Sequence, residues 1–231
     1  METFGRKSRT QIMRPLLLLL LGATSAFCQP FSFGVKGGVP LTDFLNAAKS
    51  TNANGFLNFA THTNRYIVGV TGELRLPFGL GVELDVLYRH LNYQSSQQIA
   101  GITTTISNGN TTANAFEFPL LAKYRFGTKG IHPFVDAGVA WDTLQGLKQD
   151  VKTSILGGTP SNTQSSSSPS QLQHKTTRGY VMGAGLDIKI LVIHIVPEVR
   201  FTRWGAQHFL DPSALLHSNQ NQGEFLLGIQ F

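Results

Sequence analysis

Polar and apolar residues alternate with a period of two in eight separate segments of this chain. Successive side chains of a strand point to opposite faces, so each segment predicts a strand with one apolar and one polar face. The predicted strands cover residues 31–41, 66–76, 80–89, 115–126, 133–141, 179–190, 193–204 and 224–231. A chain of this length built from such strands indicates one all-β domain.

The last segment shows the alternation most clearly. Its apolar face consists of Phe225, Leu227, Ile229 and Phe231, and the opposite face carries Glu224, Gly228 and Gln230. Chain ends usually fray, and ending on such a strand is therefore unusual for a soluble domain. We expect this closing strand to pair with residues 31–41 and to shut a barrel.

The connections between the predicted strands alternate in length. Short turns follow the second, fourth and sixth strands, whereas long polar loops cover residues 42–65, 94–114, 142–178 and 205–223. An even number of strands then places all four long loops at one end of the barrel. We expect the Ser-, Thr- and Gln-rich tract 159–173 to be mobile. Proline removes a ladder donor, so we also expect a β-bulge at Pro119 and at Pro197.

Alternation alone does not say which face lies inside, and a soluble lipocalin-like barrel with an apolar interior is the alternative. The apolar face, however, carries no charged residue before Arg203, and aromatic residues gather at both strand ends, as in membrane interfaces. The polar face carries nearly balanced charges that could neutralise one another in a narrow lumen. We therefore predict an apolar outer face and a structural charge network inside, formed by Glu73, Arg75, Glu83, Asp85, Arg89, Glu117, Lys123, Arg125, Asp187, Lys189, Glu198 and Arg200.

The N-terminal residues predict export. Basic residues in 1–14 precede Pro15 and the six leucines 16–21, which is typical of a secretory signal peptide, and we place its end at Cys28. Lipidation of Cys28 is the alternative, although Phe27 stands where a lipoprotein signal has a small residue. Residues 29–231 then form the barrel domain, with fifteen basic and twelve acidic residues. That balance, without a clustered basic face, argues against a nucleic-acid partner. Cys28 is the only cysteine, so disulfides and thiol catalysis are not expected.

The segment 116–126, Phe-Glu-Phe-Pro-Leu-Leu-Ala-Lys-Tyr-Arg-Phe, and the strand ending at Phe231 resemble the small eight-stranded outer-membrane barrels of the OmpA, OmpX and OmpW type. The resemblance implies an antiparallel up-and-down transmembrane barrel in the bacterial outer membrane, with short periplasmic turns and long extracellular loops. It also implies that the Phe231 strand is an assembly signal for the barrel assembly machinery, and that outer-membrane lipid and lipopolysaccharide surround a monomer.

The function expected from this family is non-enzymatic: a lumen plugged by side chains, with surface loops for envelope structure, adhesion or ligand contact. The alternatives are a narrow conduit for small apolar solutes and a lipid-modifying enzyme, for which His90 is the candidate base. We expect no catalytic, cofactor-binding or metal-binding residue. At the loop rim, Arg203 and Trp204 could contact lipopolysaccharide phosphates.

Overall fold

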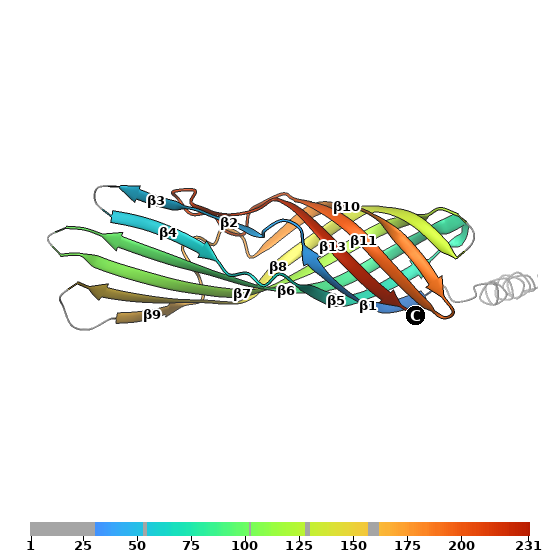
Figure 1. Ribbon diagram of the computed structural model, residues 1–231, viewed down its shortest axis with the longest axis horizontal. Helices are drawn as coiled ribbons and strands as arrows, with labels where there is room; N and C mark the ends of the chain where they lie inside the picture. Colours follow the sequence, from blue (N-terminus) through green and yellow to red (C-terminus); the bar gives the residue numbers. More distant parts are fainter. Residues whose placement is uncertain (1–30, 53–54, 102, 128–129, 157–161) are drawn as a thin grey trace, which may run out of the picture.

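Eight long strands close into an antiparallel barrel (Figure 1). The computed structural model describes residues 31–231, except 53–54, 102, 128–129 and 157–161. The proposed signal peptide, 1–28, lies outside these described residues. The barrel strands are β1 (Phe31–Pro40), β5 (Ile67–Arg75), β6 (Leu80–Ile99), β7 (Thr105–Arg125), β8 (Ile131–Ile155), β10 (Thr176–Ile190), β11 (Ile193–Trp204) and β13 (Asn221–Gln230). Among the described residues, no helix is both long and apolar enough to cross a bilayer.

The first and last strands pair and close the barrel. In the antiparallel ladder between β1 and β13, Val35 lies opposite Ile229 and Val39 lies opposite Phe225. Beyond the ladder, the backbone N–H of Phe231 donates to the Phe33 carbonyl at 2.8 Å, and the Phe33 N–H donates back at 3.2 Å. The predicted pairing of the closing strand is therefore confirmed.

The apolar face of the strands points outward and the charged face points inward. On β6 and β11, Leu84 is 51 % exposed and Val199 is 53 % exposed, whereas Glu83 and Arg200 are fully buried. Neighbouring residues of one strand thus differ completely in environment. This arrangement is the inverse of a soluble barrel, and the lipocalin-like alternative is wrong.

Neither proline produces a bulge, contrary to expectation. Pro119 lies opposite Ala140 and Pro197 opposite Leu227, and the register is the same on both sides of each proline. On the other side of each strand, the ladder simply omits the pairs around the proline. The missing N–H is accommodated by these gaps. The β-bulge lies instead at Gly146, which has a φ of +60° in β8.

Three strands continue far beyond the predicted barrel, because the segments expected to be long loops are largely β-structure. β6, β7 and β8 extend together, and β4 (Gly55–Thr61), β3 (Lys49–Asn52) and β9 (Asn162–Ser166) widen this sheet at its edges (Figure 1). A separate pair, β2 (Leu45–Ala47) with β12 (Leu216–Ser218), joins the first of these long segments to the last. At the opposite end, connections are short, and η2 (Pro77–Gly79) is a single turn.

The tract 159–173, expected to be a mobile loop, is only partly described. Residues 159–161 lie outside the described residues, but Asn162–Ser166 form β9, which pairs with β8 from Gln149 to Thr153. Thr and Ser are compatible with a strand that pairs along one edge. This strand was not predicted because the composition of the tract is polar.

Candidate functional site: the charged lumen, its extracellular cap and the outer rim

Lys36 occupies the centre of the lumen and binds three carboxylates. Its Nζ contacts Glu83, lies 2.9 Å from the Asp85 carboxylate and 3.0 Å from the Glu198 carboxylate. All four side chains are completely buried. Since an unpaired buried charge is costly, the three carboxylates and the ammonium depend on one another.

Two further cations complete this central layer. The Arg200 guanidinium donates to Glu198 at 2.7 Å and to Asp85 at 2.9 Å, and Lys123 contacts Glu83. These residues come from β1, β6, β7 and β11, so the contacts cross the lumen rather than follow one wall. Side chains therefore fill the cross-section of the barrel here.

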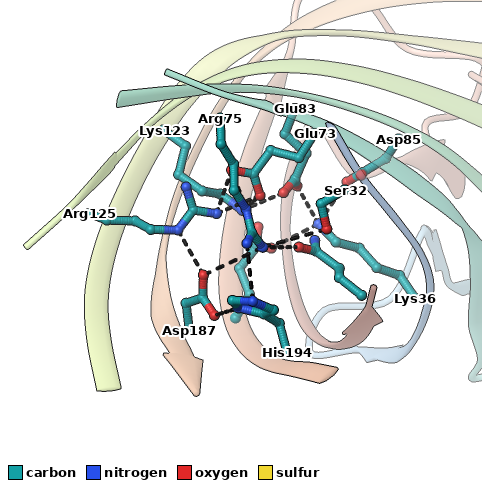
Figure 2. A network of polar contacts seen from close by, with 12 residues as sticks. Ser32, Lys36, Glu73, Arg75, Glu83, Asp85, Lys123, Arg125, Asp187 and His194 are labelled. Atoms are coloured by element: carbon teal, nitrogen blue, oxygen red, sulfur yellow. Dashed lines mark hydrogen bonds and ion pairs between the residues drawn. The ribbon is translucent and has the colours of Figure 1, made fainter. Parts of the chain in front are cut away.

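A second network closes the short-turn end of the lumen (Figure 2). Arg125 bridges Glu73 and Asp187, and its Nε lies 2.8 Å from the Asp187 carboxylate. His194 Nδ1 lies 2.5 Å from the other Asp187 oxygen, and His194 Nε2 lies 3.1 Å from Arg75. A guanidinium can only donate, so Nε2 accepts and Nδ1 carries the proton that is donated to Asp187.

A third network lies towards the long loops. Arg89 donates to Glu117 at 3.1 Å and to Glu224 at 3.0 Å, while its guanidinium stacks over the Phe44 ring at 5.1 Å. Beside it, Asp142 lies 3.1 Å from His208 Nε2. This layer joins the barrel wall to the loop that carries His208.

The described lumen carries more carboxylates than permanent cations. The six cations are Lys36, Arg75, Arg89, Lys123, Arg125 and Arg200, and the nine carboxylates are Glu73, Glu83, Asp85, Glu117, Asp136, Asp142, Asp187, Glu198 and Glu224. Asp136 is 5 % exposed, and neither of its oxygens has a hydrogen-bond partner among the described residues. A ring of acidic side chains disfavours anions in a pore, so the lumen is ill suited to anionic solutes.

The structure separates one member from the twelve residues predicted to form the network. Lys189 has the inward parity but lies at the exposed end of β10, and it forms no ion pair within the described residues. The other eleven take part in the three networks. Lys36, Asp136 and Glu224 share the inward parity but were not among the twelve, and Asp142 and His194 were missed as well. Asp142 was assigned to a loop, although it has the same parity as Asp136 on β8, and this signal would have found it.

An apolar cluster, which we call the cap, covers the extracellular end of the charged lumen. Its buried members are Phe44, Leu45, Phe59, Leu91, Tyr93, Ala113, Ala115, Leu144, Leu147, Phe209 and Leu216. On β6, the inward face therefore changes from charged at Arg89 to apolar at Leu91 and Tyr93. Burial of several large side chains stabilises this end by the hydrophobic effect. The loop residues that belong to the cap are consequently packed against one another over the lumen.

Arg203 and Trp204, predicted to contact lipopolysaccharide together, point in opposite directions. Arg203 is exposed on the outer surface, where its guanidinium donates to Asn221 at 2.6 Å. Trp204 is 3 % exposed and packs inside the barrel with Leu121, Ala140 and Val181. The prediction for Trp204 is wrong because adjacent strand residues face opposite sides, and Trp204 shares the parity of Arg200.

His90, the candidate base, has a structural partner. Its Nδ1 lies 3.0 Å from the Asn114 side-chain oxygen, which also accepts from the Tyr88 hydroxyl at 3.0 Å. No serine, cysteine or carboxylate hydrogen-bonds to His90 within the described part of the chain. Nor do the described residues include a cluster of three or more His, Cys, Asp or Glu side chains that could hold a metal ion.

A closed eight-stranded barrel with an apolar outer surface and a charged, filled interior defines the class of small outer-membrane β-barrel proteins. Comparison with family models leads to the same class: residues 23–205 match the family described as the outer membrane protein beta-barrel domain. The chain belongs to this family and is a protein of the bacterial outer membrane. No curated protein matches the chain.

Solved structures with similar folds are also small barrels. OprG from Pseudomonas aeruginosa is 16 % identical, with a TM-score of 0.50 over 87 % of this chain and 92 % of OprG. Neisserial surface protein A is 14 % identical, with a TM-score of 0.39 over 87 % and 96 %. Ail of Yersinia pestis is 10 % identical, with a TM-score of 0.35 over 88 % and 100 %. At these identities the similarity to OprG shows the fold alone.

Proposed function

We propose that this protein is a sealed, non-enzymatic surface barrel that displays a rigid extracellular sheet for envelope structure, adhesion or ligand contact. The observation that carries the proposal is the central layer, in which Lys36 and Arg200 join carboxylates across the whole lumen. The interior of an eight-stranded barrel has room only for side chains, and in this barrel those side chains form ion pairs. The cap forms a second seal above this layer.

The extracellular sheet is the surface that the proposal assigns to partners. Its outer face carries mainly amide and hydroxyl side chains, including Gln94, Asn108 and Asn110, with Lys148 and Lys152 on the next strand. A rigid strand-built surface presents such groups in a fixed pattern, which lowers the entropy lost on binding. The partner that we expect for this surface is a polar extracellular ligand.

Assembly belongs to the same proposal. The outward residues of the closing strand, Phe225, Leu227, Ile229 and Phe231, are 39 to 65 % exposed on the finished barrel. They present an apolar edge pattern that the barrel assembly machinery would bind before closure. We expect the mature protein to be a monomer surrounded by lipid.

Single-channel conductance in planar bilayers tests the sealed lumen. The purified, refolded protein should migrate faster on gels before heating than after it, and should give no steady conductance. Steady conductance would support the conduit for small apolar solutes instead. Hydrolysis or transfer activity on labelled phospholipid or lipid A that is lost in His90→Ala would establish the enzyme and contradict the proposal.

A further inference from the structure

Four side chains form a continuous patch on the outer surface, at the long-loop end of β8, β10 and β11. Trp141 lies directly opposite Arg178 in the ladder between β8 and β10, and Tyr180 lies opposite Arg203 in the ladder between β10 and β11. All four have the outward parity. Arg178 and Arg203 are diagonal neighbours across one strand pair, a geometry that places their backbones roughly 7 to 8 Å apart and their Cβ atoms somewhat closer.

The patch lies where the lipid-facing band ends. One step towards the membrane, the outward residues are apolar: Met182 is 60 % exposed and Phe201 is 41 % exposed. Tyr180 and Trp141, at 75 and 42 % exposure, have the position that aromatic side chains take at membrane interfaces. The two arginines are therefore at the level of lipid headgroups in the outer leaflet.

Neither arginine is neutralised by the described protein. Arg178 forms no side-chain hydrogen bond or ion pair there, and Arg203 donates to the neutral amide of Asn221. Asp142, which lies opposite Thr177 in the ladder between β8 and β10, faces the lumen and contacts His208. Elsewhere on the outer surface the opposite holds, since Arg65 pairs with Asp43 at 3.6 Å.

An open pocket of about 440 Å³ adjoins Arg178, and its lining includes Trp141, His174, Thr176, Gly205 and Ala206. Such a volume is within the range of small-molecule sites. The Thr176 hydroxyl and the His174 imidazole are hydrogen-bonding groups in the same lining as Arg178.

We propose that Arg178 and Arg203 bind a phosphate group of a phosphorylated glycolipid in the outer leaflet, the lipid A part of lipopolysaccharide, with the adjoining sugar in the pocket beside Trp141. Guanidinium groups match phosphate oxygens in bidentate geometry and form strong, charge-assisted hydrogen bonds. The site retains Arg203 from the sequence prediction, replaces Trp204 with Trp141 and adds Arg178. It does not depend on whether the lumen is sealed.

Binding of bisphosphorylated lipid A to the full-length mature protein in detergent tests this site. The fluorescence of Trp141, measured in a Trp204→Phe background, reports binding. Loss of two charge-assisted contacts should weaken binding by about tenfold or more in Arg178→Gln/Arg203→Gln. Arg65→Gln, which removes a paired outer-surface cation, should bind like the parent. Heat-modifiable gel migration shows that each variant has folded.

Two further ligands identify the group that is recognised. Dephosphorylated lipid A should bind the parent protein as weakly as bisphosphorylated lipid A binds the double variant, and millimolar inorganic phosphate should not compete. Equal affinity of the double variant and the parent would overturn the proposal. Full competition by inorganic phosphate would also overturn it, because the site would then recognise free phosphate rather than a lipid headgroup. Neither result bears on the sealed lumen, which the conductance experiment tests separately.

Discussion

Trp141 and Trp204 flank β10 at nearly the same height but face opposite sides of the barrel wall. Of two consecutive residues of β10, Arg178 lies opposite Trp141 on β8 and Gly179 lies opposite Trp204 on β11. Trp141 is 42 % exposed on the outer surface, whereas Trp204 is 3 % exposed in the lumen. They are the two tryptophans of the chain, so fluorescence can distinguish the two faces.

We therefore expect brominated lipids to quench the two tryptophans differently. In vesicles, the emission of Trp204→Phe, which retains Trp141, should be strongly quenched, whereas that of Trp141→Phe should be nearly unaffected. Quenching requires contact with the brominated chain, which the barrel wall denies to Trp204. Equal quenching of the two variants would show that the assignment of the faces is wrong.

Replacement of Lys36 should destabilise the barrel severely. Lys36→Met leaves Glu83, Asp85 and Glu198 without their shared partner, and breaking a buried ion pair from one side costs about 3 to 5 kcal/mol. The free energy of unfolding by urea in lipid vesicles measures this cost. Lys189→Met is the matched control, because Lys189 is exposed, and it should change stability by less than about 0.5 kcal/mol. Similar losses in both variants would contradict the central role of Lys36.

The cap should open without loss of the membrane barrel. Phe209 is fully buried in the cap, and removal of a buried aromatic side chain costs about 3 to 5 kcal/mol. We expect Phe209→Ala to increase protease cleavage in residues 206–220 while the heat-modifiable barrel persists. The neighbouring Leu210, at 38 % exposure, provides the control Leu210→Ala, which should be cleaved like the parent. Loss of the whole barrel in Phe209→Ala would show that cap and barrel fold as one unit.

Alkaline pH should also open the cap. The outward apolar band of β6 ends near Tyr88, so Tyr93 lies beyond the membrane-spanning part, and burial raises the pKa of its phenol. A raised pKa means that the contribution of Tyr93 is complete below the unfolded value of about 10 and is lost as the pH rises above it. Protease cleavage of the cap should increase in that range. In Tyr93→Phe the increase should be smaller, and an equal increase would exclude Tyr93 as the cause.

The transmembrane fold could be predicted because its rule is local. A period of two, applied to residues such as Val82, Glu83 and Leu84, assigns each side chain to one face, and β8 departs from it only beyond the membrane, at Gly146. The same rule also predicts that Trp204 points inward, because it lies two residues beyond Thr202 on the inward face. That error came from grouping aromatics by their distance from the strand end rather than by their parity.

The cap could not be predicted in this way because its members are scattered over four loops. Phe44, Phe59, Leu144 and Phe209 become neighbours only when the barrel brings the loops together. Each of these segments is polar on average, so composition indicated loops. The phase of the alternation also shifts at the Gly146 bulge, after which Leu147 points inward. The lumen contacts were likewise beyond sequence analysis, since pairing across the barrel depends on the register of strands that are not adjacent.

The length of β6, β7 and β8 determines which part of the protein is accessible from outside the cell. From Tyr88 to Ile99, β6 continues for eleven residues, about 37 Å at the rise of an antiparallel strand. Lipid headgroups and the first sugars of the outer leaflet surround the base of this extracellular sheet rather than its tip. A large molecule that approaches the protein from outside the cell would therefore meet the β6–β7 tip first.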